Sequence, residues 1–212
     1  MRYYPVFLDL AGKPAVVIGG GKIARQKVEG LLNAGAQVTV ISPELSAPLS
    51  RLAAGGRFRH TRREYRPGDL EGYALAFVAT DDRSVNAVVA REGKERGVWV
   101  NAVDDPPNCD FIMPGVVERG PLVVAVSTSG TSPAMARKMR EELQEFLTEE
   151  HVLMLELAAE VRAELRERGI QAPPDIWNAA LDAELKRLLA GGRRAEARDR
   201  LLRALLEPRS GV

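Results

Sequence analysis

Three consecutive glycines, Gly19 to Gly21, stand between a short apolar run at residues 14–18 and a helical pattern that begins at Lys22. Together with Ala24 they match the spacing G-x-G-x-x-A. In that spacing the first glycine permits a tight turn, the second lets the backbone approach a pyrophosphate, and the small last residue lets the helix pack closely on a sheet. An ordinary turn from strand to helix would also tolerate glycines. At the first strand of an alternating pattern, the loop predicts a dinucleotide site at the helix N-terminus.

Strand and helix signals alternate along the first hundred residues, as a parallel sheet with helical crossovers requires. We therefore expect a Rossmann-like α/β fold. Apolar or β-branched runs predict further strands, and helical patterns lie between them. The predicted strands are at residues 14–19, 37–42, 58–62, 73–80 and 97–103, and the predicted helices are at 22–36, 47–54 and 83–96.

The pattern changes after Cys109. Two apolar strands joined by a Glu-Arg-Gly-Pro turn predict an antiparallel hairpin within residues 111–130. From Thr131 onward the sequence has helical periodicity, and we expect helices at 133–147, 151–168, 175–190 and 193–206. One of these helices carries an apolar stripe too long for a surface helix with nothing to cover it, and a partner subunit is one explanation. The stripe consists of Leu153, Leu157, Val161 and Leu165.

The composition limits the classes of partner. There are 30 basic and 29 acidic residues, so the net charge of +1 gives no reason to expect nucleic-acid binding. A single cysteine excludes an internal disulfide and fits a reducing cytoplasm. Neither a signal peptide nor an apolar run of about 18 residues is present, so we expect a cytoplasmic protein without a membrane span. His60 and His151 lack ligand spacing, and we expect no resident metal.

The candidate cofactor site extends from the glycine loop to the ends of neighbouring strands, where ligands of such sheets bind. Glu44 follows the second strand closely and is the candidate ribose ligand, although it would also suit the first turn of a helix. Because no arginine stands beside it to hold a 2′-phosphate, NAD is preferred over NADP. Thr80 and Asp81 end the fourth strand, where helix capping is the alternative. These candidates are Gly19, Gly20, Gly21, Lys22, Ile23, Ala24, Ser42, Pro43, Glu44, Thr80 and Asp81.

Several motifs occur in an order that resembles one family. They are GGG-x-x-A, the segment ATDD at residues 79–82, N-x-V-D at 101–104, F-x-x-P at 111–114 and SGTSP at 129–133. Over residues 4–147 the chain resembles the precorrin-2 dehydrogenase and sirohydrochlorin ferrochelatase part of siroheme synthase. The resemblance implies NAD-dependent oxidation of precorrin-2 to sirohydrochlorin, with insertion of ferrous iron in some members. It also implies a homodimer. The methyltransferase module of the larger members is not expected in this chain.

The resemblance further divides the chain into parts. It implies an NAD-binding Rossmann domain at residues 1–112, a small α+β dimerisation region at 113–147 and a C-terminal helical domain at 148–212. In the family the acid of the N-x-V-D motif is the important one, which is Asp104 here. A carboxylate base suits the reaction because loss of a hydride is accompanied by loss of a proton. As an isolated pattern, Asp-Asp-Pro-Pro is an ordinary turn, and Asp105 keeps that interpretation.

The remaining candidates follow from the same motifs. Asn101 and Val103, in the N-x-V-D motif, are assigned to the cofactor. The hydroxyls and N–H groups of the next loop are expected to bind a substrate carboxylate, and Arg137 to pair with another. Ser132 and Pro133 alone would serve as a helix cap. The loop residues are Ser127, Thr128, Ser129, Gly130 and Thr131. A different class, a nucleotide-sensing domain that binds NAD without reacting it, remains the alternative.

Overall fold

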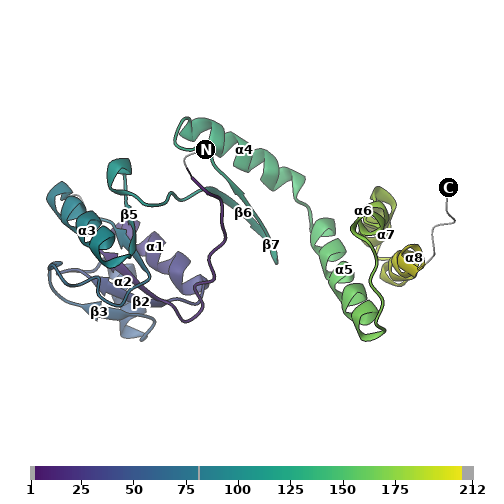
Figure 1. Cartoon of the computed structure of the whole chain (residues 1–212), viewed down its shortest axis with the longest axis horizontal. Coiled ribbons are helices and arrows are strands. Elements are labelled where there is room, and N and C mark those ends of the chain that lie inside the picture. The colour runs from purple at the N-terminus through teal and green to yellow at the C-terminus, as the bar shows by residue number, and fades with distance from the viewer. Residues whose placement is uncertain (1–2, 81, 207–212) are drawn as a thin grey trace. The chain divides into compact units, whose positions relative to one another are not determined.

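The computed structural model describes residues 3–80 and 82–206 (Figure 1). Two compact units are present, Met1–Met113 and Pro114–Val212, which we call the N-terminal unit and the C-terminal unit. Each has its own hydrophobic core. The predicted division of the second half at residue 148 stays a prediction.

The N-terminal unit is built on a five-stranded parallel sheet, with the strands in the order β3-β2-β1-β4-β5 (Figure 1). This is the doubly wound order in which the chain reverses direction beside the first strand. Helices connect β1 to β2, β2 to β3 and β4 to β5. The elements are β1 (Pro14–Ile18), α1 (Lys22–Asn33), β2 (Gln37–Ile41), α2 (Ala47–Ala54), β3 (Arg59–Thr61), β4 (Leu75–Val78), α3 (Arg83–Arg96), β5 (Trp99–Ala102) and the short 3-10 helix η1 (Pro106–Asn108).

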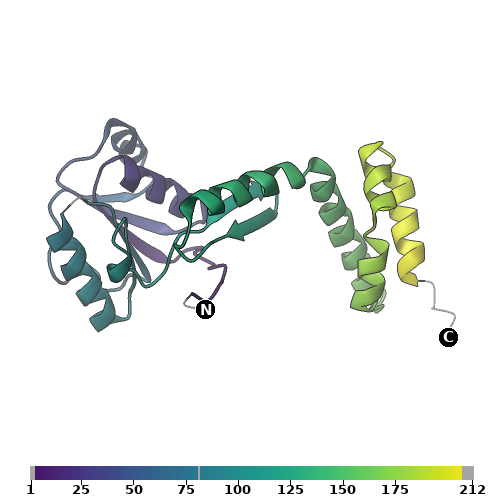
Figure 2. The same cartoon turned by 90° about the horizontal axis from the view of Figure 1, so that it is seen from above.

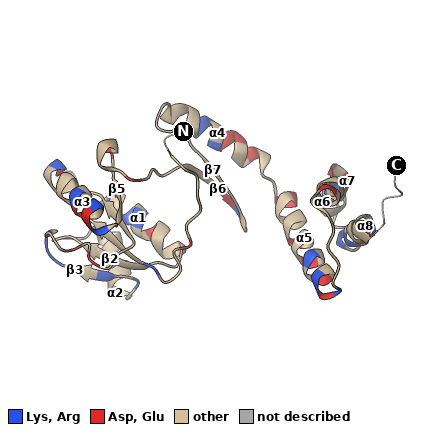
Figure 3. Cartoon of the chain, in the orientation of Figure 1, with Lys and Arg blue, Asp and Glu red and all other residues tan. Residues whose placement is uncertain are grey.

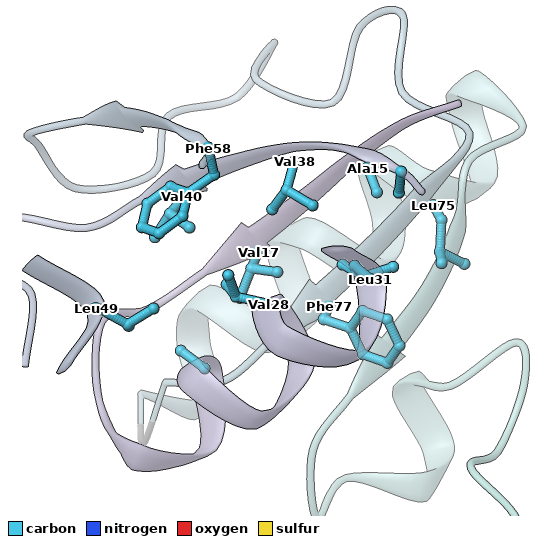
Figure 4. Packing of buried hydrophobic residues seen from close by; sticks show 12 residues of the cluster. Ala15, Val17, Val28, Leu31, Val38, Val40, Leu49, Phe58, Leu75 and Phe77 are labelled. Carbon is cyan, nitrogen blue, oxygen red and sulfur yellow. The ribbon is translucent and has the colours of Figure 1, made fainter. Parts of the chain in front are cut away.

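Both faces of this sheet are covered, which explains the nearly continuous apolar strands. On one face, Val17 and Phe77 pack against Val28 and Leu31 of α1, and Leu49 of α2 joins the same cluster (Figure 4). On the other face the alternate residues of the strands pack against α3. The predicted Rossmann-like fold is therefore confirmed.

A buried carboxylate ties α3 to the loop that precedes β4. Glu92 is 6% exposed and accepts hydrogen bonds from the Tyr65 hydroxyl and from the backbone N–H groups of Gly68 (2.9 Å) and Leu70 (3.1 Å). Arg96 adds an ion pair at 2.9 Å. Burial would raise the pKa of Glu92, but these donors outweigh it and hold the pKa below its usual range.

The C-terminal unit begins with the predicted antiparallel hairpin, β6 (Gly115–Arg119) and β7 (Leu122–Val126). Helix α4 (Pro133–Phe146) packs against this hairpin (Figure 2). The remaining helices are α5 (Glu149–Glu167), α6 (Pro174–Ala180), α7 (Ala183–Ala190) and α8 (Arg194–Leu206).

The structure decides two points about these helices that the sequence raised. The apolar stripe of α5 needs no partner subunit, because Leu157, Val161 and Leu165 are buried against α7 and α8 of the same chain. The single helix predicted at 175–190 is divided into α6 and α7. Asp182 causes the break, since its side chain accepts a hydrogen bond from the N–H of Leu185 at 2.9 Å and so starts a new helix.

Helices α4 and α5 each carry both acidic and basic side chains, and along α4 the basic ones precede the acidic ones (Figure 3). The presence of both signs on these two helices agrees with the near-zero net charge. Within the described part of the chain, no helix combines the length and the apolar character that crossing a membrane requires.

Candidate functional site

The glycine loop joins β1 to α1 at the carboxyl edge of the sheet. Gly19 has φ +121°, a conformation that side chains rarely adopt, and a Cβ there would lie 2.3 Å from the Ala79 carbonyl oxygen. Ala24 is fully buried in the core beneath α1. The predicted roles of these two residues, in the turn and in close helix packing, are confirmed. Ile23, at the start of the helix, is 40% exposed.

Gly21 stands at the N-cap of α1 with open space in front of it. A Cβ at this position would meet nothing within 4 Å, and no side chain caps the helix. The first N–H groups of a helix need partners and carry the positive end of its dipole. An unobstructed N-terminus of this kind fits the pyrophosphate of a dinucleotide.

Gly20 has a role that the sequence pattern did not indicate. A Cβ there would lie 1.9 Å from the Glu44 carbonyl oxygen and 2.7 Å from Ser42 Oγ. Ser42 Oγ donates to the same carbonyl at 2.6 Å, and the Ser46 N–H donates to the Gly20 carbonyl at 2.8 Å. The glycine loop and the loop after β2 therefore touch backbone to backbone. Ser42 is buried, while Pro43 and the Glu44 side chain are exposed.

The end of β4 contributes the next candidates. Thr80 is half-buried, and its hydroxyl accepts a hydrogen bond from the N–H of Asp82 at 3.3 Å. Asp82 is the N-cap of α3 and accepts from the Ser84 N–H at 2.8 Å, so capping accounts for this acid. Asp81 lies outside the described residues.

The loop after β5 is held in place by its own polar side chains. Asn101 is buried, and its amide donates to the Phe111 carbonyl at 2.8 Å. Asp110 accepts from the backbone N–H of Val100 at 2.9 Å, and Asp105 accepts from the Asn108 amide at 2.9 Å. Asp105 is thus the turn residue that the sequence indicated. The side-chain amide of Asn101 serves the loop, and its assignment to the cofactor stays a prediction, as does that of Val103.

Asp104 is the exception in this loop. Its φ is +59°, in the left-handed region that only a few non-glycine residues adopt. Its side chain is exposed at the carboxyl edge of the sheet, directly after β5. A conformation of this kind costs free energy and persists where the surrounding structure imposes it, often at functional sites. The backbone geometry therefore adds an independent observation to the motif that selected Asp104.

Lys27, in the second turn of α1, joins the candidate site. Its Nζ lies 5.3 Å from the centroid of the Phe77 ring. Burial lowers the pKa of Lys27, and the Asp104 carboxylate opposes this by attraction. No sequence pattern could have indicated the pair, because the two residues belong to elements far apart in the chain.

The predicted substrate loop belongs to the C-terminal unit and folds on itself. Thr128 Oγ1 donates to the Ser132 carbonyl at 3.0 Å and accepts from the Ser132 N–H at 3.2 Å. Ser127 Oγ accepts from the Ser129 N–H at 3.0 Å, and Ser129 has φ +54°. Ser132 caps α4, as expected. Gly130, Thr131 and the Arg137 side chain are exposed, and their binding roles stay predictions.

An open hollow of about 520 Å³ lies at the opposite, amino-terminal edge of the sheet, beside the ion pair of Glu71 and Arg96. Its lining contains no glycine loop or uncapped helix N-terminus, so the carboxyl edge is the better candidate. Among residues 3–80 and 82–206, no three or more His, Cys, Asp or Glu side chains gather as metal ligands would.

Comparisons with known proteins agree with this geometry. The model of a family described as putative NAD(P)-binding matches residues 6–115, and that of the central part of sirohaem biosynthesis protein matches residues 119–145. Siroheme synthase of Methylobacillus flagellatus is 43% identical over 168 residues, which are 79% of this chain and 36% of that protein. Siroheme synthase of Methylococcus capsulatus is 40% identical over 210 residues, which are 96% of this chain and 44% of that protein.

The chain thus spans less than half the length of these two relatives. Among solved structures, SirC, a precorrin-2 dehydrogenase, is similar with a TM-score of 0.77 and 27% identity, covering 94% of this chain and 98% of that one. The resemblance derived from the motifs is confirmed by these matches. Because the first family model covers more than half of the 212 residues, the chain belongs to the putative NAD(P)-binding family.

Proposed function

We propose that this protein is a dehydrogenase that oxidises precorrin-2 to sirohydrochlorin with NAD as the acceptor. The observation that carries the proposal is the similarity to a precorrin-2 dehydrogenase along nearly the whole of both chains, at a TM-score of 0.77. The glycine loop and Asp104, at one edge of the sheet, supply the groups that such a reaction needs.

The residues of the N-terminal unit have distinct tasks in this proposal. The uncapped N–H groups of α1, at Lys22 and Ile23, bind the pyrophosphate over the open space at Gly21. NAD, when bound, takes up the hydride that leaves the tetrapyrrole carbon. Asp104 accepts the proton that leaves with it, so the charge and the hydrogens balance.

The preference for NAD over NADP rests on the loop after β2. Ser42 Oγ already donates to the Glu44 carbonyl, and the Glu44 carboxylate is exposed at this edge. A carboxylate accepts hydrogen bonds from a ribose 2′-hydroxyl and repels a 2′-phosphate. Within residues 42–46 no basic side chain stands ready to offset that repulsion.

The C-terminal unit is proposed to bind the substrate's carboxylates. Its loop offers the backbone N–H groups around Gly130 and Thr131 together with exposed hydroxyls, and Arg137 follows on α4. An arginine suits a carboxylate because its guanidinium can donate two parallel hydrogen bonds. The homodimer and the cytoplasmic location implied earlier remain part of this proposal.

Insertion of ferrous iron is a second candidate activity. The relatives that are 43% and 40% identical are named siroheme synthase, which favours this addition. Iron would enter as a substrate and bind the tetrapyrrole nitrogens, whose N–H protons need an acceptor. Asp104 could serve that step as well.

Anaerobic turnover with precorrin-2 and NAD, followed by tetrapyrrole absorbance, tests the proposal. We expect sirohydrochlorin to form with NADH in equal amount, faster than without protein. Later addition of ferrous iron shows whether the protein accelerates metal insertion. Bound NAD without any oxidation would contradict the dehydrogenase and favour the sensing domain.

Asp104→Asn tests the proposed proton acceptor. Asparagine tolerates the left-handed backbone about as well as aspartate, so the variant removes the charge and keeps the loop. We expect turnover to fall by about a hundredfold or more, the usual contribution of a general base, with NAD affinity unchanged. Wild-type turnover in this variant would return Asp104 to the role of a turn residue.

A further inference from the structure

A lysine with no role beyond solvation would point away from the sheet on a surface helix, and Lys27 does not. It occupies the side of α1 that faces the sheet, between Ala24 and Leu31, both of which are buried. Its ammonium reaches the Phe77 ring, with Nζ 5.3 Å from the centroid. The strands packed against α1 are β1, β2 and β4, and none of their residues is ionisable. A half-buried cation therefore stands among apolar neighbours.

The neighbours of that cation lead to the loop that carries Asp104. Phe77 is the register partner of Asn101 in β5, and the Phe111 ring packs edge-on against Phe77 with centroids 5.5 Å apart. Asn101 in turn donates to the Phe111 carbonyl. Asn101, which precedes Asp104, and Phe111, at the far end of the loop, are thus fixed around the ring beneath the Lys27 ammonium.

Burying a cation is unfavourable unless a counter-charge compensates it. The Asp104 carboxylate supplies an opposite charge, whose attraction partly offsets the lowering of the Lys27 pKa by burial. The strain at Asp104, with φ +59°, needs a surrounding structure that imposes it.

We propose that Lys27 is a positioning residue for Asp104, whose ammonium, seated on Phe77 at the carboxyl edge of the sheet, orients the carboxylate for proton transfer. This inference rests on the proposed function, because it assigns Lys27 a role through the proton acceptor. It concerns turnover and gives Lys27 no contact with the cofactor.

A double-mutant cycle in the full chain tests it, using Lys27→Met, Asp104→Asn and the two together. Methionine keeps an unbranched stem of similar length and removes the charge. Arg25→Met is the matched control: it removes one positive charge from the same helix, at a side chain that is 43% exposed and paired with Glu29. Each protein is measured for kcat, for KM and Kd of NAD, and for Tm.

We expect Lys27→Met to lower kcat about tenfold, the scale of one lost charge interaction near a protein surface. Its KM and Kd for NAD should stay within about twofold of wild type, and Arg25→Met should match wild type. In the Asp104→Asn background, Lys27→Met should have no further effect on kcat, because residues that act through one another are not additive. Lys27→Arg, which restores a cation, should recover most of the lost rate.

Other outcomes would overturn the inference in distinguishable ways. Independent effects of the two substitutions on kcat, or a selective loss of NAD affinity in Lys27→Met, would remove Lys27 as a positioning residue and leave the dehydrogenase intact. A fall in kcat that only follows a fall in Tm, with no recovery by arginine, would make Lys27 merely structural. An inactive wild-type protein that still binds NAD would overturn the proposed function, and the role of Lys27 with it.

Discussion

At the scale of single residues, two glycines of the loop are required for different reasons, although they look alike in the sequence. Gly20 and Gly21 are adjacent and both lack a side chain, but their surroundings differ. Gly20 faces the backbone of the next loop, and a Cβ at this position would lie 1.9 Å from the Glu44 carbonyl oxygen. Gly21 faces open space at the start of α1. One glycine serves the fold, and the other keeps the helix N-terminus accessible.

This difference predicts opposite results for two alanine substitutions. Gly20→Ala should lower the free energy of unfolding by about 1–3 kcal/mol, because two backbone segments must separate to admit a methyl group. Gly21→Ala should leave stability nearly unchanged and weaken NAD binding by about tenfold or more, since the methyl group fills the space meant for the pyrophosphate. Urea unfolding and titration with NAD measure the two quantities. Loss of stability in Gly21→Ala would mean that its open space is required by the fold.

Sequence reasoning located most of this edge but not all of its chemistry. The spacing G-x-G-x-x-A identifies Gly19, Gly21 and Ala24, since the turn, the ligand and helix packing each constrain one position. The position between the glycines is free in that pattern, so the contact of Gly20 with the loop after β2 was not predictable. The same holds for Lys27 and Asp104, whose interaction depends on how α1 lies beside the end of β5.

At the scale of elements, helix boundaries followed the strength of their local signals. The bounds predicted for α2 and α3 match the structure: glycine follows both helices, and the Asp82 side chain caps the start of α3. The break between α6 and α7 was missed, as Asp182 stands within a stretch of good helix formers. The aspartate followed by Leu185 was the available signal, but a cap is recognisable only when the helix is already known to begin there.

The junction between α3 and the loop before β4 depends on Glu92. We expect Glu92→Gln to lower the free energy of unfolding by about 1–3 kcal/mol, because one amide oxygen cannot serve all the donors and the amide N–H groups face other donors. Glu95→Gln, an exposed position on the same helix, is the control. An equal, small effect of both changes would show that the network adds nothing beyond the packing of α3.

The pH dependence of stability gives a second reading of this network. The folded-state pKa of Glu92 lies below its ordinary value of 4.5. Its contribution is therefore fully present above pH 4.5 and is lost as the pH falls through the folded-state pKa, since the unfolded chain takes up the proton first. The free energy of unfolding of the wild type, measured with urea, should therefore fall over that acid range. That of Glu92→Gln should fall less.

At the scale of the whole molecule, the sequence predicted the secondary-structure type of each unit. It did not predict which elements cover the apolar face of α5. The change from an alternating pattern to a hairpin and helices after Cys109 marks the boundary near Met113. A partner subunit was one explanation for the stripe of α5, because its length exceeded what a lone helix can leave exposed. The helices that cover it, α7 and α8, carry apolar residues of their own. The pattern of a single helix does not specify which other helix such residues contact.

Because the C-terminal unit has its own core, a substitution there should lower stability without changing NAD binding. Leu157 of α5 is fully buried among Val161, Leu185 and Leu201, so Leu157→Ala should cost about 2–5 kcal/mol through lost burial and a cavity. Leu155→Ala, two residues away and 37% exposed, should cost far less. Below the unfolding transition, both variants should bind NAD as wild type does, because the candidate residues for the dinucleotide all belong to the N-terminal unit. Weakened NAD binding in Leu157→Ala but not in Leu155→Ala would mean that the helical core supports the cofactor site, contrary to this expectation.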